Sequence, residues 1–180
     1  MKKAAAAGTL CFAVALAACG PARIVVTVDV LSFLRSQGLD AFSFGIRGGV
    51  PQTDLTASQL FSVPSRFGPG RVDSVQVTAG AILESTQGGG TVTLDIFFAK
   101  DEASLFIGQP YVSANATVSG VQTDTLLPPV TRSVNDTVFS TPDVWVGVRA
   151  RFATDPGPDM VGRLAVTVLQ LRVVMHDRGF

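Results

Sequence analysis

Apolar and polar side chains alternate with a period of two along most of the chain. Segment 23–33, for example, places Ile24, Val26 and Val28 on one face and Thr27 and Asp29 on the other. This period is typical of β-strands with one buried face. The pattern predicts seven strands, at residues 23–33, 41–46, 73–85, 91–99, 110–120, 143–153 and 162–177.

Glycines and breaks in the alternation refine this picture. The glycine-rich segment 87–91 separates two of the strands so closely that residues 73–99 are predicted to form a β-hairpin. Gly80 indicates a bulge or bend within the first strand of that pair. In the last strand the apolar positions change parity, which predicts a second bulge near Gln170.

Helical periodicity is scarce. Segments 53–61 and 100–106 are each predicted to form at most a turn or two of helix, the first capped by Asp54 or Thr56 and the second by Asp101. Residues rich in Pro, Gly, Ser and Thr predict loops at 47–72 and 120–137.

The fold expected from these elements is all-β. It is an antiparallel β-sandwich of about seven to eight strands, immunoglobulin-like or related, with a small β-barrel as the alternative. A transmembrane barrel is disfavoured because strands are few and their outward faces carry Asp95, Arg149 and Arg151. Residues 23–180 are expected to form this single domain.

The N-terminal segment has a different pattern. Lys2 and Lys3 precede an uncharged apolar run over residues 4–16, which is shorter than the roughly 20 residues that a membrane-spanning helix needs. Its length and basic flank fit a secretory signal. The run ends in Leu16-Ala17-Ala18-Cys19 followed by Gly20.

These residues resemble the lipobox of bacterial lipoproteins. The resemblance implies that residues 1–18 are a signal peptide, that cleavage falls between Ala18 and Cys19, and that the Cys19 thiol carries a diacylglycerol. Gly20, where Asp favours inner-membrane retention in well-studied diderm bacteria, implies the outer membrane of the cell envelope. The alternative is an ordinary secretory signal cut after Ala18, which leaves Cys19 as a free thiol.

The lipidated tether would be short. Residues 19–22 alone separate the acylated cysteine from the first predicted strand, and four extended residues span at most ~14 Å. We therefore expect one end of the sandwich to lie at the membrane surface.

Composition excludes several classes of function. The 14 basic residues include Lys2 and Lys3, so residues 19–180 carry 12 basic and 14 acidic groups, a net charge of −2. Eleven of those 12 are Arg and they form no basic block, so we expect no nucleic-acid partner. With Cys11 in the signal and Cys19 acylated, no disulfide is expected.

Catalytic and metal-binding residues are not evident. His176 is the only histidine, no Gly-x-Ser-x-Gly motif is present, and no catalytic residue or cofactor is expected. Asp155 and Asp159, with Asp143 or Asp136, are weak calcium candidates of the hard-oxygen type. Turn formation is the simpler explanation for these acids.

Acids and aromatic residues within strands give the remaining predictions. Asp29 and Asp95 are expected to be solvated on outer faces. Phe97, Tyr111 and Trp145 fall on the less apolar parity of their strands and are candidates for an exposed aromatic interaction surface.

Three functions follow as hypotheses. The first is a non-catalytic binding or structural domain, anchored to the membrane and bound to an envelope protein or glycan. The second is a carrier or sensor of a lipid or other apolar ligand, suggested by the phenylalanines. The third, a glycan or peptide hydrolase that uses loop carboxylates, has the least support.

Overall fold

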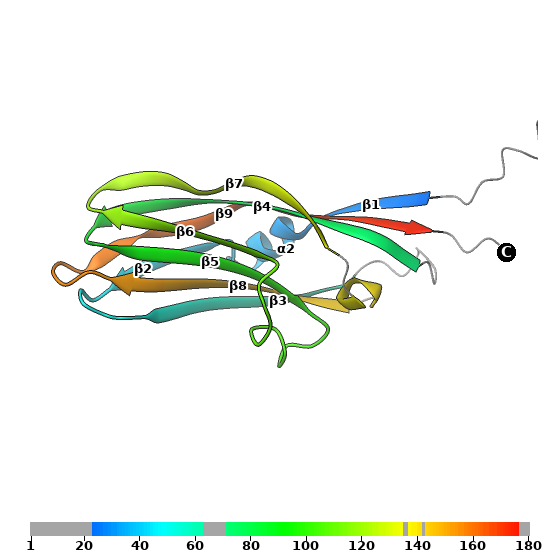
Figure 1. Cartoon of the computed structure of the whole chain (residues 1–180), viewed down its shortest axis with the longest axis horizontal. Helices are drawn as coiled ribbons and strands as arrows, with labels where there is room; N and C mark the ends of the chain where they lie inside the picture. The colour runs from blue at the N-terminus through cyan, green and yellow to red at the C-terminus, as the bar shows by residue number, and fades with distance from the viewer. Residues whose placement is uncertain (1–22, 63–70, 135–136, 142, 177–180) are drawn as a thin grey trace, which may run out of the picture.

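The chain is a two-layered antiparallel β-sandwich (Figure 1). The computed structural model describes residues 23–62, 71–134, 137–141 and 143–176. What we call the β9 sheet contains β1 (Arg23–Asp29), β2 (Ala41–Ile46), β4 (Arg71–Gln87), β7 (Gln122–Val134) and β9 (Met160–His176). The β8 sheet contains β3 (Thr53–Ser62), β5 (Gly89–Ala99), β6 (Val112–Ser119) and β8 (Asp143–Thr154).

The strand order identifies the connectivity. The β9 sheet runs β1-β9-β4-β7, with β2 also paired to β9, and the β8 sheet runs β3-β8-β5-β6. Strand β2 therefore pairs with β9, β3 with β8, β4 with β7 and β5 with β6, as in one long hairpin rolled into two layers. This is the jelly-roll arrangement, whereas immunoglobulin domains combine their strands differently. Within the described ranges, the two sheets do not close into the small barrel that was the alternative.

The core forms where the inward faces of the two sheets meet. Val77, Leu83, Leu94, Val148 and Leu164 are among the buried side chains there. The alternation predicted from sequence is therefore confirmed for the central strands, and area burial of this kind supplies most of a sandwich's stability. The bend predicted at Gly80 is found, since the register of β4 with both β7 and β9 shifts beside it. The bulge predicted near Gln170 lies at Thr167 instead, where β9 has one residue more than β4 between the partners of Gly80 and Ala81.

The predicted hairpin over residues 73–99 is wrong. Strands β4 and β5 follow one another along the chain but lie in different sheets. Gly88 and Gly90 adopt φ values of 78° and 149°, and they carry the chain across from one layer to the other. A Cβ at Gly90 would lie 2.2 Å from the Ala153 carbonyl oxygen, so the crossing needs a glycine there.

Three other predicted elements are corrected. Residues 23–33 were predicted to form one strand. Strand β1 ends at Asp29, and helix α2 (Val30–Ser36) follows it, because Val30, Leu31 and Leu34 share a buried helical face. The segment 53–61, predicted to hold a turn of helix within a loop, is the edge strand β3.

The predicted loop at 120–137 contains the edge strand β7. Pro128 and Pro129 suggested a loop, but they lie where the register with β4 jumps from Val130 to Leu127. Proline is tolerated at such edges and bulges because no backbone N–H is needed there.

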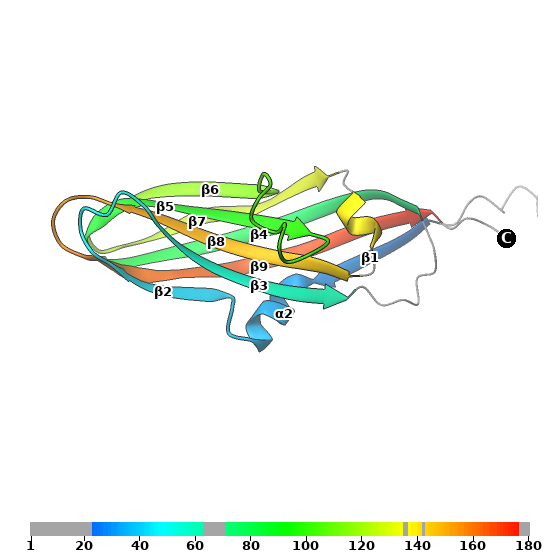
Figure 2. The ribbon, with the colours of Figure 1, turned by 90° about the horizontal axis from the view of Figure 1, so that it is seen from below.

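Two short helical segments complete the described structure. Figure 2 shows α2 projecting at the edge of the sandwich, between β1 and β2. Phe33 of α2 contacts Phe61 of β3, with 6.4 Å between ring centroids. The second segment is the single-turn η2 (Thr137–Ser140). Throughout the described residues, no helix has the length and apolar character required to cross a bilayer.

Two neighbouring strand glycines test this packing. A Cβ at Gly162 in β9 would lie 2.2 Å from the Glu84 carbonyl oxygen and 2.7 Å from Cζ of Phe44, whereas Gly45 in β2 has no atom within 4 Å of its Cβ position. We expect Gly162→Ala to lower the free energy of unfolding by about 2 kcal/mol through overpacking. Gly45→Ala should leave it unchanged or raise it by roughly 0.5 kcal/mol. Urea unfolding followed by the fluorescence of Trp145 measures both, and equal effects would contradict the register.

Candidate functional site

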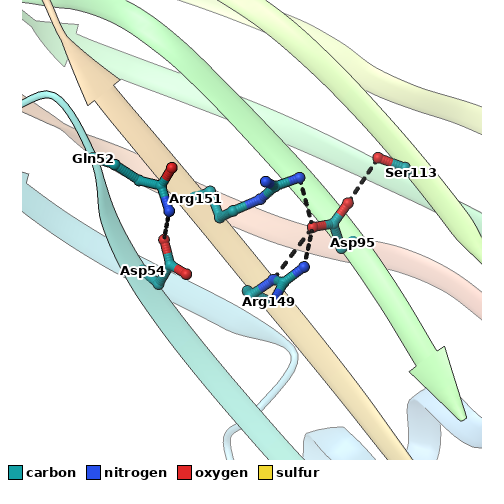
Figure 3. A network of polar contacts seen from close by, with 6 residues as sticks. All are labelled: Gln52, Asp54, Asp95, Ser113, Arg149 and Arg151. Carbon is teal, nitrogen blue, oxygen red and sulfur yellow. Dashed lines mark hydrogen bonds and ion pairs between the residues drawn. The ribbon is translucent and has the colours of Figure 1, made fainter. Parts of the chain in front are cut away.

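A charged network lies on the outer face of the β8 sheet, in the middle of its two central strands. Asp95 of β5 lies opposite Arg149 of β8 and Ser113 of β6. Arg149 donates from Nε and Nη2 to Oδ2 of Asp95, at 3.3 and 3.0 Å. Nη2 of Arg151 lies 3.0 Å from the same oxygen, and Ser113 Oγ donates to Oδ1 at 2.7 Å (Figure 3).

Burial makes this network costly to disrupt. The Asp95 side chain is 0% exposed, Arg149 is 20% exposed and Arg151 is 37% exposed. A carboxylate removed from water is stable only when charged and hydrogen-bonding partners replace the water. The two arginines and the serine supply those partners, so the prediction that Asp95 is solvated is wrong.

The charges on this part of the face balance only when the neighbouring Asp54 is counted with the network. Two guanidinium groups face one carboxylate, which gives the three side chains a net charge of +1. Asp54 of β3 lies opposite Arg151 in register, but Asp54 Oδ1 accepts a hydrogen bond from Gln52 Nε2 at 3.2 Å. Within the described ranges no ion pair joins Asp54 to Arg151.

An apolar cluster covers the neighbouring part of the same face. The β5–β6 loop (residues 100–111) folds back over the sheet and places Leu105 and Phe106 against Phe97 and Trp145. The rings of Phe97 and Phe106 meet edge to face, with 5.4 Å between centroids. The guanidinium of Arg149 lies 4.6 Å above the Phe97 ring, a distance at which cation–π attraction operates.

This cluster contradicts the expected exposure of Phe97. That side chain is 1% exposed because the β5–β6 loop covers it. Trp145 is half-buried at the rim of the same cluster. The alternation correctly places Phe97 and Trp145 on the outer face, but the pattern carries no signal that a loop returns over them.

Tyr111 belongs to a different group of aromatic rings. It contacts Phe98 and Phe139, with centroid separations of 5.4 and 5.7 Å, and packs against the core. The three predicted aromatics therefore do not form one exposed surface. Tyr111 and Phe98 instead line an open cleft of about 610 Å³, beside the β5–β6 loop, with Lys100 and Asp101 also in its lining.

The calcium candidates Asp155 and Asp159 lie in the loop between β8 and β9. Oδ1 of Asp159 accepts a hydrogen bond from the Gly48 backbone at 3.2 Å, and the Asp155 backbone bonds to Gly49 and Gly89. These bonds join the loops at this end of the sandwich. Among the described residues, no three His, Cys, Asp or Glu side chains are grouped as a metal site.

Several predicted residues lie outside the described residues. Ala18, Cys19 and the rest of the tether are among them, as is Asp136. The predicted lipidation site therefore stays a prediction. Asp29 and Asp143 are exposed, as predicted for Asp29.

The hydrogen bonds of Asp95 are internal to the sheet. Both carboxylate oxygens of Asp95 already accept hydrogen bonds. Strands β5 and β8 are adjacent and antiparallel, so Asp95 and Arg149 meet as a direct cross-strand pair. The sequence does place opposite charges, Asp95 and Arg149, at outward positions of two predicted strands, which is the signal that could have predicted this ion pair. The alternation alone does not establish that these two strands are neighbours in the sheet.

Comparisons with known proteins identify no family. No protein-family model and no curated protein matches the sequence. A structure of infectious bursal disease virus, Gx strain, is similar with a TM-score of 0.43 and 13% identity, over 87% of this chain and 36% of that chain. The T13 particle of the same virus gives a TM-score of 0.40 and 12% identity, over 87% and 35%. The chain spans about a third of the length of these structures, and a similarity this distant says nothing about its function.

The two acids Asp95 and Asp54 form a matched pair for a stability test. Asp95→Asn removes the charge that holds two guanidinium groups, so we expect a loss of about 2–3 kcal/mol in the free energy of unfolding. Asp54→Asn, on the same face but exposed, should change it by less than ~0.5 kcal/mol. Urea unfolding compares the two variants, and an Asp95→Asn protein as stable as the wild type would contradict the network.

Gly147 controls the docking of the β5–β6 loop. A Cβ there would lie 2.7 Å from Phe106 Cε1 and 2.9 Å from Leu105 Cγ. We expect Gly147→Val to displace this loop and make it cleavable by protease, while Gly108→Val, with open space around it, should not. Limited proteolysis with mass spectrometry locates the cut, and a loop that stays resistant in Gly147→Val would argue against this docking.

Proposed function

We propose that this chain is a lipid-anchored protein of the bacterial cell envelope whose β-sandwich acts as a non-catalytic binding or structural domain close to the membrane. The observation that carries this proposal is the position of the first strand. Strand β1 begins at Arg23, only four residues after the lipobox cysteine, Cys19.

The geometry of β1 supports a short distance to the membrane. Arg23 pairs with His176 at the end of the β9 sheet, and a tether of four extended residues reaches at most ~14 Å. An acylated Cys19 would hold that end of the sandwich near the lipid headgroups. Gly20 favours the outer membrane on the same resemblance.

The outer face of the β8 sheet supports the binding part of the proposal. It presents a preorganised pair of arginines on rigid strands, and sites on such elements are held more accurately than sites on loops. An envelope protein or a glycan is the expected partner. The β8–β9 loop, which carries the acids Asp155 and Asp159, lies at the end opposite the start of β1 (Figure 1).

A second candidate function is the binding of a lipid or other apolar ligand. The cleft of about 610 Å³ lined by Phe98 and Tyr111 supports it, since small-molecule sites commonly have volumes of roughly 300–1,000 Å³ and aromatic linings. Polar residues such as Lys100 and Asp101 also line that cleft, and a purely apolar ligand would desolvate them. The first function is therefore the better supported.

The two cysteines allow a controlled test of the anchor. We expect cells that express the wild-type chain with labelled palmitate to yield a labelled protein in the membrane fraction. Cys19→Ala should lose the label and leave the membrane fraction, because the acylated thiol is gone. Cys11→Ala, within the predicted leader, should keep both. Label that persists in Cys19→Ala, or its absence from the wild type, would overturn the anchor.

A further inference from the structure

We propose that an apolar strip on the outer face of the β8 sheet is a second membrane contact, which lies on the interface of the same bilayer that holds the acylated Cys19. The strip consists of Leu60 in β3, Trp145 in β8, and Phe106 and Ile107 in the β5–β6 loop. This inference rests on the proposed lipid anchor and adds to it the orientation of the sandwich on the membrane.

The four side chains of the strip are neighbours. Leu60 and Trp145 lie directly opposite each other in the register of β3 with β8. Phe106 and Trp145 pack on the same small cluster around Phe97, and Ile107 follows Phe106 in the loop. Single exposed apolar residues are common on protein surfaces and need no explanation, whereas a group of them marks an interaction site.

Ile107 is the most exposed member of the strip, at 82%. The turn that carries it is braced by its own hydrogen bonds. The Ile107 N–H donates to the Ser104 carbonyl oxygen at 3.2 Å, and the Ser104 N–H donates to Oδ1 of Asp101 at 2.9 Å. The loop therefore holds a large apolar side chain out in water, which is unfavourable until another apolar surface covers it.

The strip lies near the end of the sandwich that the tether would hold at the membrane. Trp145 is two residues from the start of β8 and Leu60 is two residues from the end of β3, each ~7 Å at the rise of a strand. Figure 1 shows that β8 starts and β3 ends toward the end of the long axis at which β1 begins, and that the β5–β6 loop projects on the side of the β8 sheet. A sandwich held by a tether of at most ~14 Å can tilt until the strip meets the lipid.

The chemistry of the strip suits a bilayer interface. Trp is enriched at the level of the headgroups because its ring is apolar while its indole N–H is polar. The tether makes the contact an intramolecular step, so an interaction too weak to hold a free protein on lipid is sufficient here.

The charges around the strip indicate which lipids it favours. Lys100, Asp101, Glu102 and Asp143 flank it and are exposed, and one positive and three negative charges give a net −2. Anionic headgroups attract basic segments, which this rim is not. We therefore expect an apolar contact with zwitterionic lipid.

The test places the full chain, extracted in a neutral detergent, in phosphatidylcholine vesicles and uses Trp145 as the reporter, since it is the only tryptophan. Bromine atoms near the headgroup end of the acyl chains quench a tryptophan only at close range. We expect brominated vesicles to lower the wild-type fluorescence to about half its value in unbrominated vesicles, because the strip places the Trp145 ring at the interface. Added phosphatidylglycerol should not increase the quenching. Flotation of the same vesicles reports separately whether the chain is anchored.

Two equally exposed apolar residues provide matched variants. Ile107→Ser removes the most exposed part of the strip and should reduce the quenching about fivefold, since interfacial binding scales with the apolar area buried. Val121→Ser should leave it unchanged. Val121 is also 82% exposed, but it lies in the β6–β7 turn at the end of the sandwich away from the start of β1 (Figure 1). Both variants should float as the wild type does, because neither changes Cys19, and far-UV circular dichroism melts establish that each is folded.

Each contrary result has a defined meaning. A wild-type chain that floats without being quenched, quenching that persists in Ile107→Ser, or an equal loss in Val121→Ser would overturn the membrane contact while the anchor stands. A wild-type chain that does not float would overturn the anchor, and the contact with it. Sedimentation velocity in detergent tests a second copy as the occupant. A wild-type dimer that becomes monomeric in Ile107→Ser, with no quenching in vesicles, would assign the strip to that copy instead of the bilayer.

Discussion

The buried ion pair between Asp95 and its two arginines is the constraint on which the outer face of the β8 sheet depends. A carboxylate with no exposed surface cannot remain in a sheet without cations beside it. The pairing of β5 with β8 supplies Arg149 directly opposite and Arg151 one row further along the face. The network thus fixes the register of the two central strands through side chains as well as through the backbone ladder.

The ion pair is continuous with the apolar cluster beside it. Arg149 is held between Asp95 and the ring of Phe97, and Phe97 in turn is covered by Phe106. Desolvation by the β5–β6 loop lowers the local dielectric, which strengthens the electrostatic interaction next to it. The two halves of this face therefore stabilise each other, although one is charged and the other is apolar.

The sequence predicts the layers of this fold better than their connections. Alternation identifies Val77, Leu94 and Val148 as inward-facing because each lies in a strand with one buried face. The same alternation cannot distinguish a hairpin from two strands that face each other across the core, which is why β4 and β5 were wrongly paired. The edge strands β3 and β7 were missed because an edge strand has less burial to enforce a pattern, and β7 also contains Pro128 and Pro129.

The candidate site was predicted only in part, for a related reason. Parity places Asp95, Phe97 and Arg149 on the outer face correctly, because it depends on each strand alone. Their burial depends on which strand lies alongside and on where residues 100–111 return, and both are long-range properties. An exposed aromatic surface was the natural expectation for Phe97 and Trp145, and the covering loop replaces it with a small second core.

The position of the arginine pair also determines how an anchoring membrane would act on it. Strand β1 begins and β9 ends at one end of the long axis, while the β8–β9 loop forms the other (Figure 1). Strand β8 starts at Asp143, near the end where β1 begins, so Arg151 lies eight residues along the strand toward the far end, about 26 Å at the rise of a β-strand. With Cys19 acylated, this distance would exceed the Debye length of ~8 Å at physiological salt. Anionic lipid headgroups would then be screened from Arg149 and Arg151, so the buried ion pair with Asp95 would not be disturbed by the membrane.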